Sequence, residues 1–198
     1  MSFNGRSLAT HRFLLTMAAI GFIGTASPGY AQGFISPFVG YDFGGDAKCA
    51  QLSGCTDTRL NVGVALGAMG SLIGFEEEVG YAPDFFGSGT GLNSSVLTVM
   101  SNLMLAPKIG PVRPYVLAGT GLMKSHVELK TASILTTDNN TVGWDVGGGV
   151  MGMISGHFGV RGDLRYFHSF KDLTVLGFTL ENSKLNFGRA SVGAVLKF

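Results

Sequence analysis

The stretch FGVRGDLRYF, from Phe158 to Phe167, alternates between apolar residues and residues that are mostly charged or small. Side chains that repeat with a period of two lie on opposite faces of a β-strand. The stretch therefore predicts a strand with one apolar face and one face that carries glycine and ions of both signs. The apolar face carries Phe158, Val160, Leu164 and Tyr166, and the other face carries Gly159, Arg161, Asp163, Arg165 and Phe167.

The same period recurs along the chain, for example in LNVGVAL (60–66), GWDVGGGVMGMI (143–154) and ASVGAVLKF (190–198). Short links such as PKIGP and SGH alternate with longer ones. This alternation suits an up-and-down antiparallel barrel whose two ends meet different surroundings. The sequence thus predicts an all-β, eight-stranded antiparallel barrel, with strands at about 33–43, 58–68, 71–82, 94–106, 111–127, 140–154, 157–169 and 184–198.

The composition excludes several classes of protein. Glycine accounts for 31 of the 198 residues, and charged residues make up 14%, against an average near ~25%. The formal net charge is +1 and the sequence contains no basic stripe, so we expect no nucleic-acid partner. The length suits one ordinary domain.

The N-terminal segment has the parts of a secretory signal peptide. Basic residues come first, and an apolar run at 13–24 follows. As a helix that run reaches about 18 Å, which is too short for the ~30 Å core of a membrane, so a signal is favoured over an anchor helix. Small residues at Gly29 and Ala31 place cleavage after Ala31. We therefore predict a signal peptide at 1–31 and a barrel domain at 32–198.

A soluble barrel and a membrane barrel share the alternation and differ in which face meets which solvent. A soluble barrel buries its apolar face, whereas a membrane barrel turns that face to lipid and fills its interior with polar and small residues. Ions of both signs favour the second arrangement, because a buried charge without a partner is very costly. The predicted lumen ion network consists of Asp42, Arg59, Glu76, Glu78, Arg113, Asp145, Arg161, Asp163, Arg165 and Arg189.

Aromatic residues near the predicted strand ends also favour a membrane barrel, because such barrels carry aromatic girdles at both interfaces. The length of the chain allows each strand the ~9–11 residues that cross a bilayer. The predicted girdle residues are Tyr41, Phe43, Tyr81, Trp144, Tyr166, Phe187 and Phe198.

One residue conflicts with this pattern. If Glu76 and Glu78 face the lumen, Glu77 faces lipid, where a carboxylate costs up to about a few kcal/mol. Glu77 then lies at the interface, is protonated, or marks a bulge or a subunit contact. The sequence leaves these alternatives open.

Two of the longer links contain notable residues. Cys49 and Cys55 lie in a chain predicted to be secreted, so they form one possible disulfide, with a pair of free thiols as the alternative. In the link at 83–93, Phe85 and Phe86 are predicted either to contact a partner or lipopolysaccharide, or to join the outer girdle.

No catalytic, cofactor-binding or metal-binding residues are predicted. His168 and Ser169 are adjacent, so on a strand they point to opposite faces and do not form a base–nucleophile pair. Gly147, Gly149 and Gly152 fit the pattern GxGxxG, but no helix follows them, so we expect no dinucleotide site. The four histidines are scattered and suggest no metal site.

The last residues resemble the C-terminal signal of bacterial outer-membrane barrels. In that signal a polar residue, a glycine, an apolar residue and a final aromatic recur at fixed spacing. Ser191, Gly193, Leu196 and Phe198 fill these places. The resemblance implies that the barrel-assembly machinery reads this signal.

More widely, RPYVLAGTGL, GWDVGGGV and GVRGDLRYF resemble strands of the small outer-membrane β-barrel family, which includes the eight-stranded transmembrane domain of outer-membrane protein A. The resemblance implies a multi-pass barrel in the outer membrane of a Gram-negative bacterium. It also implies that both termini are periplasmic and that four long loops lie outside the cell. Outer-membrane lipid and lipopolysaccharide are its implied surroundings, and the sequence names no surface partner.

The expected function is that of an integral outer-membrane barrel with a structural or surface-interacting role and no enzymatic activity. An eight-stranded barrel is wide enough only for packed side chains, so we do not expect a general porin. The alternatives are a narrow channel or carrier for small apolar compounds and, second, a lipid A-modifying enzyme. The adjacency of His168 and Ser169 speaks against the enzyme, because the similar lipid A deacylases place the serine two residues after the histidine.

Overall fold

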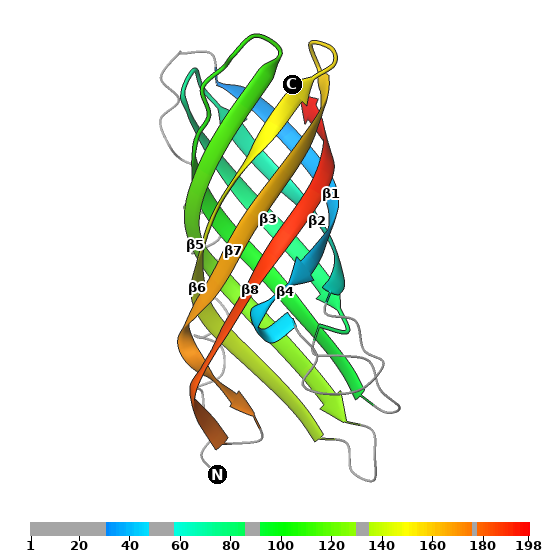
Figure 1. The fold of residues 1–198 in the computed structure, drawn as a ribbon, viewed down its shortest axis with the longest axis vertical. Helices are drawn as coiled ribbons and strands as arrows, with labels where there is room; N and C mark the ends of the chain where they lie inside the picture. Colours follow the sequence, from blue (N-terminus) through cyan, green and yellow to red (C-terminus); the bar gives the residue numbers. More distant parts are fainter. Residues whose placement is uncertain (1–30, 48–57, 86–91, 130–134, 176–177) are drawn as a thin grey trace, which may run out of the picture. The chain divides into compact units, whose positions relative to one another are not determined.

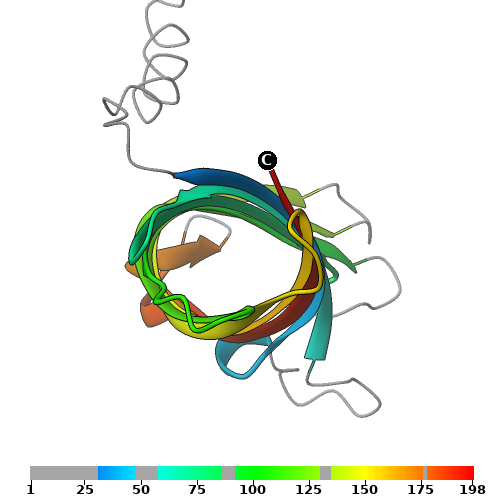
Figure 2. The same ribbon diagram turned by 90° about the horizontal axis from the view of Figure 1, so that it is seen from above.

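The computed structural model describes residues 31–47, 58–85, 92–129, 135–175 and 178–198, which form a closed antiparallel β-barrel. Each strand pairs with its neighbours in the sequence, and the last strand closes the barrel against the first (Figure 1, Figure 2). The predicted fold class is confirmed. The elements are β1 (Gln32–Phe43), the 3₁₀ helix η2 (Gly45–Ala47), β2 (Thr58–Met69), β3 (Ile73–Pro83), β4 (Leu92–Leu105), β5 (Val112–Leu129), β6 (Leu135–Met153), β7 (Phe158–Val175) and β8 (Phe178–Lys197).

The two ends of the barrel carry different connections. At the upper end in Figure 1, short turns join β2 to β3, β4 to β5 and β6 to β7, and the C-terminus lies there as well. We call this the turn end, and we call the opposite end, where β1 joins β2 and β3 joins β4, the loop end. In the turn between β4 and β5, Gly110 has a φ of 62°, a left-handed conformation that glycine adopts at little cost.

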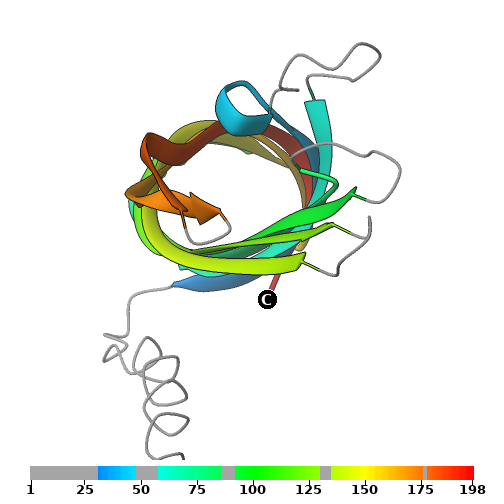
Figure 3. The same ribbon diagram turned by 90° about the horizontal axis from the view of Figure 1, so that it is seen from below.

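Several strands extend further at the loop end than the sequence predicted. The added segments are polar at successive positions, as in TTDNNT of β6, so apolar alternation does not reveal them. In the end view of Figure 3 the β7–β8 hairpin projects across the opening, after register shifts that begin beyond His168. β6 begins at Leu135, β7 continues to Val175 and β8 begins at Phe178, where the predicted boundaries were near 140, 169 and 184.

The outer surface of the barrel is apolar. Val62, Val160 and Leu196, for example, are 44%, 49% and 46% exposed. The alternate positions face the interior, among them Arg161 and Arg165, which are 4% and 2% exposed. The barrel is therefore inverted relative to a soluble one. Within the described residues no helix is long and apolar enough to span a membrane.

The interior contains two apolar clusters as well as ions. The expectation of an interior filled by polar and small residues is therefore wrong at both ends of the barrel, where large apolar side chains, several of them flexible methionines, fill the space. The loop-end cluster consists of Ala47, Ala82, Phe85, Val96, Met100, Met123, Phe167, Leu185 and Phe187. The turn-end cluster consists of Phe34, Met69, Met104, Ala106, Tyr115, Leu117, Met151 and Val195.

Two aromatic predictions are wrong, and residue parity explains the first. Phe187, predicted for the girdle, is 1% exposed and stacks on Phe167 inside the barrel with ring centroids 4.8 Å apart. It shares its parity with Arg189, which also faces inward. Phe85, predicted to make an outer contact, packs edge-to-face on Phe187 at 4.9 Å. Phe86 lies outside the described residues. The predicted girdle residues that do face outward are Tyr41, Phe43, Tyr81, Trp144, Tyr166 and Phe198.

Candidate functional site

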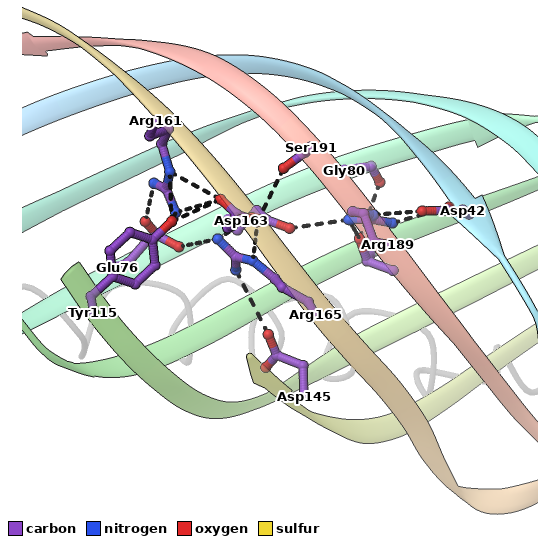
Figure 4. A network of polar contacts seen from close by, with 12 residues as sticks. Asp42, Glu76, Gly80, Tyr115, Asp145, Arg161, Asp163, Arg165, Arg189 and Ser191 are labelled. Carbon is purple, nitrogen blue, oxygen red and sulfur yellow. Dashed lines mark hydrogen bonds and ion pairs between the residues drawn. The ribbon is translucent and has the colours of Figure 1, made fainter. Parts of the chain in front are cut away.

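An ion network fills the interior between the two apolar clusters (Figure 4). Arg165 of β7 is at its centre. Its Nη2 lies 2.8 Å from Glu76 Oε1 and 2.9 Å from Glu78 Oε2. Its Nε lies 3.0 Å from Asp163 Oδ1, and its Nη1 lies 3.7 Å from Asp145 Oδ2. All of these side chains are buried, so the protein itself supplies their partners.

Arg161 extends the network toward the turn end. Its Nη1 donates to Glu76 Oε2 at 2.6 Å, and its Nη2 lies 3.0 Å from Asp163 Oδ2. The Tyr115 hydroxyl donates to Asp163 Oδ2 at 2.9 Å and accepts from Arg161 Nη2 at 2.9 Å. The guanidinium also lies 5.2 Å from the centroid of the Tyr115 ring, within the range of a cation–π contact. Because Tyr115 belongs to the turn-end cluster, network and cluster are continuous.

Arg189 of β8 extends the network toward the loop end. Its Nε donates to Asp42 Oδ1 at 2.7 Å, and its Nη1 lies 3.1 Å from Glu78 Oε1. Its guanidinium lies 4.6 Å from the ring centroid of Phe167, a member of the loop-end cluster. Gly80 leaves room for this arginine, because a Cβ at position 80 would lie only 2.5 Å from Arg189 Nη1.

Neutral side chains complete the network, and the sequence analysis missed them because it considered charged residues only. Asn61 and Ser191 carry a usable signal, since each lies two positions from an inward-facing arginine and therefore shares its face. Asn102 has no charged neighbour of this kind. Ser191 donates to Asp163 at 3.0 Å, and Asn61 donates to Asp42 at 3.4 Å. The Asn102 amide, oriented with its nitrogen toward Asp145, donates to Asp145 Oδ1 at 2.7 Å.

Two residues predicted for the ion network face the interior but lie away from the described network. Arg59 Nε donates to the backbone carbonyl of Phe85 at 3.1 Å, which ties the start of the β3–β4 connection to β2. Arg113 is buried near the turn end, and it forms no ion pair with any residue that the structure describes. The network therefore joins the acids Asp42, Glu76, Glu78, Asp145 and Asp163 to the bases Arg161, Arg165 and Arg189.

This arrangement braces the barrel across its interior. It connects side chains of β1, β3, β6, β7 and β8, and each arginine contacts at least two carboxylates. Removal of one such ion leaves the others buried without compensation, which is strongly destabilising. In the part of the chain that the structure describes, no group of three or more His, Cys, Asp or Glu side chains is arranged to hold a metal ion.

Comparison with known protein families agrees with this inverted barrel. The family model described as the outer membrane protein beta-barrel domain matches residues 15–198. The chain belongs to this family. The protein is therefore an outer-membrane β-barrel, and its apolar outer surface faces lipid.

Solved outer-membrane barrels share the fold at low identity, which shows the fold alone. Neisserial surface protein A is 14% identical with a TM-score of 0.61, and the match covers 84% of this chain and 97% of that one. Ail of Yersinia pestis, solved with the heparin analogue sucrose octasulfate, is 13% identical with a TM-score of 0.57, covering 85% and 99%. A major outer membrane protein of Thermus thermophilus is 14% identical with a TM-score of 0.56, covering 85% and 100%. A comparison with curated proteins finds no match.

On the lipid-facing surface of this outer-membrane barrel lies the one residue that the sequence could not explain. Glu77 points outward, and the Ser101 hydroxyl lies 2.8 Å and 2.7 Å from its two carboxylate oxygens. The ladder around Glu77 is regular, with Leu66 and Ser101 as its register partners. The bulge considered from the sequence is therefore absent at this position.

The residues of the predicted assembly signal lie on both faces of β8 and just beyond its end. Ser191 and Gly193 face the interior, whereas Leu196 and Phe198 face lipid. The backbone N–H of Phe198 donates to the carbonyl of Gly33 at 3.0 Å, so the last residue is held against the first strand of the outer-membrane barrel. Whether the assembly machinery reads these residues stays a prediction.

The histidine and serine that suggested catalysis lie on opposite sides of the outer-membrane barrel wall. The Ser169 hydroxyl faces the interior and accepts from the Leu185 N–H at 2.9 Å. The His168 ring is on the lipid-facing side, with its centroid 5.6 Å from that of Trp144 and 6.3 Å from that of Tyr166. The possible disulfide of Cys49 and Cys55, and residues 1–30 of the predicted signal peptide, lie outside the described residues.

Proposed function

We propose that the protein is a structural, non-conducting barrel of the outer membrane that offers a surface for contacts outside the cell and catalyses no reaction. The layered interior is the observation that best supports this proposal. An eight-stranded barrel is only wide enough for its own side chains, and here they include the large, fully buried Arg189, Phe167 and Phe187. An ion that crossed the barrel would have to pass two apolar clusters and displace a bonded network between them.

We place the turn end in the periplasm and the loop end outside the cell. In outer-membrane barrels short turns face the periplasm and longer connections face outward. With this orientation, Leu196 and Phe198 of the predicted assembly signal lie on the periplasmic side.

Extended strands at the loop end support a surface-interacting role. The β6–β7 ladder ends at Gly143 and Ser169, although β6 begins at Leu135 and β7 continues to Val175. Beyond that point the facing edges of β6 and β7 have no ladder partner among the described residues. Such edges present backbone N–H and C=O groups that can pair with an added strand of another protein.

Conductance in planar lipid bilayers tests the closed interior. We expect the purified, folded protein to give no steady single-channel steps under conditions in which a general porin, added as a control, conducts. The physical reason is the absence of a continuous polar path through the two apolar clusters. Steady steps from the protein itself would contradict the proposal and favour the narrow channel.

The mass of lipid A tests the absence of enzymatic activity. We expect lipid A from cells that produce the protein to match lipid A from cells that lack it, because His168 and Ser169 lie on opposite faces of the barrel wall. A mass change that disappears with His168→Ala would contradict the proposal and favour the lipid A-modifying enzyme.

A further inference from the structure

A row of polar side chains crosses the lipid-facing surface over three adjacent strands. Glu77 of β3 is the register partner of Ser101 of β4, and Ser101 is the register partner of Thr120 of β5. All three side chains lie on the outer face of the barrel. Apolar rows flank this polar row on both sides: Phe75, Leu103 and Ala118 toward the turn end, and Val79, Val99 and Leu122 toward the loop end.

The polar row lies within the apolar band rather than at its border. β3 begins at Ile73 and ends at Pro83. With a rise of ~3.3 Å per residue and a strand tilt near ~40°, Glu77 lies ~10 Å from one end of β3 and ~15 Å from the other, measured along the membrane normal. The headgroup region therefore does not reach the carboxylate.

Within one copy of the barrel, the Glu77 carboxylate has fewer hydrogen-bond donors than its two oxygens can accept. The Ser101 hydroxyl is close to both carboxylate oxygens, but it has one proton and donates to one oxygen at a time. Leu66, the register partner on the other side, offers no donor. The hydrocarbon of the membrane contains no water to supply further donors, so an ionisable group here marks a functional contact.

We propose that this polar row is the contact surface for a second copy of the chain in the outer membrane. Both copies are inserted in the same direction, so a two-fold axis along the membrane normal relates them. With the axis beside β4, β3 of each copy faces β5 of the other. Thr120 of each copy then approaches Glu77 of the other copy, and the Thr120 hydroxyl supplies a donor that the carboxylate lacks within one copy.

Self-complementarity favours a second copy over a different protein. The acceptor Glu77 and the donor Thr120 lie on opposite sides of Ser101, so a two-fold axis brings each acceptor toward a donor of the other copy. Because the strands tilt by ~40°, the two positions differ by ~6 Å in depth, a distance that the Glu77 and Thr120 side chains together span. The two Glu77 positions remain about 7 Å apart, because with a strand tilt near ~40° each lies ~3.7 Å from the axis, on opposite sides. The flanking apolar rows exchange contacts with lipid for contacts with protein, as transmembrane segments do when they associate.

Disulfide cross-linking in intact outer membranes tests this contact. In a background that carries Cys49→Ser and Cys55→Ser, Val99→Cys puts a thiol on β4 beside the proposed axis. Val192→Cys puts a matched, lipid-exposed thiol on β8, on the far side of the barrel. After oxidation we expect Val99→Cys to give a product of twice the monomer mass, at about ten times the yield of Val192→Cys, as expected for a contact held by intramembrane hydrogen bonds.

Two further variants show whether the polar row carries the contact. Added to Val99→Cys, Glu77→Leu should lower the dimer yield about tenfold and Thr120→Val about threefold, because each removes one side of the acceptor–donor match. Different migration of boiled and unboiled protein verifies that each variant is a folded barrel. The proposal is overturned by equal yields from Val99→Cys and Val192→Cys, by a product of another mass, or by an undiminished yield with Glu77→Leu.

Discussion

Glu76 and Glu77 are neighbours in the sequence, but they lie in opposite regions of the molecule. Glu76 faces the interior, where Arg161 and Arg165 lie 2.6 Å and 2.8 Å from its oxygens. Glu77 faces lipid, where Ser101 alone donates to it within the described barrel. One step along a strand turns a side chain from one face to the other. The difference shows that the surroundings of a carboxylate depend on which face of the barrel wall it occupies, rather than on its neighbours in the sequence.

The same contrast extends to the whole barrel. Interior side chains have fixed partners, so a deletion there leaves a cavity or an uncompensated charge. On the outer surface, mobile acyl chains replace whatever a substitution removes. We therefore expect matched substitutions to have large effects inside and small effects outside or away from the network.

The largest effect is expected for Arg165→Met. It leaves Glu76, Glu78 and Asp163 without the central cation, and loss of one partner from a buried ion network costs about 3–5 kcal/mol. Arg113→Met is the matched control, since Arg113 forms no ion pair with the described residues, and it should cost about 1 kcal/mol. The free energy of unfolding in urea, with the protein in lipid vesicles, is followed by fluorescence of Trp144, the single tryptophan. Equal losses for the two variants would show that the network does not hold the barrel.

A smaller but clear difference is expected between Phe187→Ala and Phe43→Ala. Phe187 stacks on Phe167 in the loop-end cluster, so its removal leaves a cavity and costs about 3 kcal/mol. Phe43 is exposed to lipid, and acyl chains as apolar as the ring fill its place, so the cost should be about 1 kcal/mol. The same unfolding assay measures both. A greater loss for Phe43→Ala would reverse the assignment of inside and outside.

The smallest effects are expected for the two neighbouring glutamates themselves. Glu76→Gln removes charge-assisted hydrogen bonds to Arg161 and Arg165 and should cost about 2 kcal/mol. Glu77→Gln removes a charge from the lipid-facing surface, so the free energy of unfolding should change by less than about 1 kcal/mol or increase. Urea unfolding at low protein-to-lipid ratio separates this effect from any contact between copies. A loss with Glu77→Gln as large as with Glu76→Gln would remove the contrast.

The sequence predicted most of the fold because its strongest signal, the period of two, is local. Each strand shows which residues share a face, so the common face of Arg161, Asp163 and Arg165 could be read from FGVRGDLRYF alone. Their inward direction was predicted from ions of both signs along the whole chain. The loop-end extensions of β6, β7 and β8 could not be read in this way, because segments with polar residues at successive positions carry no apolar period.

Partner choice inside the barrel depends on which strands face each other across the lumen. Arg113 and Arg165 look equivalent in the sequence, yet only Arg165 reaches the carboxylates of β3, while Arg113 lies near the turn end. Likewise, nothing local shows that Phe85, from the β3–β4 connection, closes the interior against Phe187 of β8.

The sequence by itself determined an antiparallel barrel whose strands carry one apolar face and one face with ions of both signs, because the alternation of side chains needs no knowledge of distant residues. The cost of burying unpaired charge, together with the aromatic residues near strand ends, then favoured an apolar outer surface and an inner face with paired ions. Only the tertiary structure decided which ions pair, where the two apolar clusters close the lumen, and that Glu77 aligns with Ser101 and Thr120 across three strands. The reason is physical. Parity along a strand is fixed by covalent geometry, whereas contacts across the lumen and register between strands exist only once the barrel has closed.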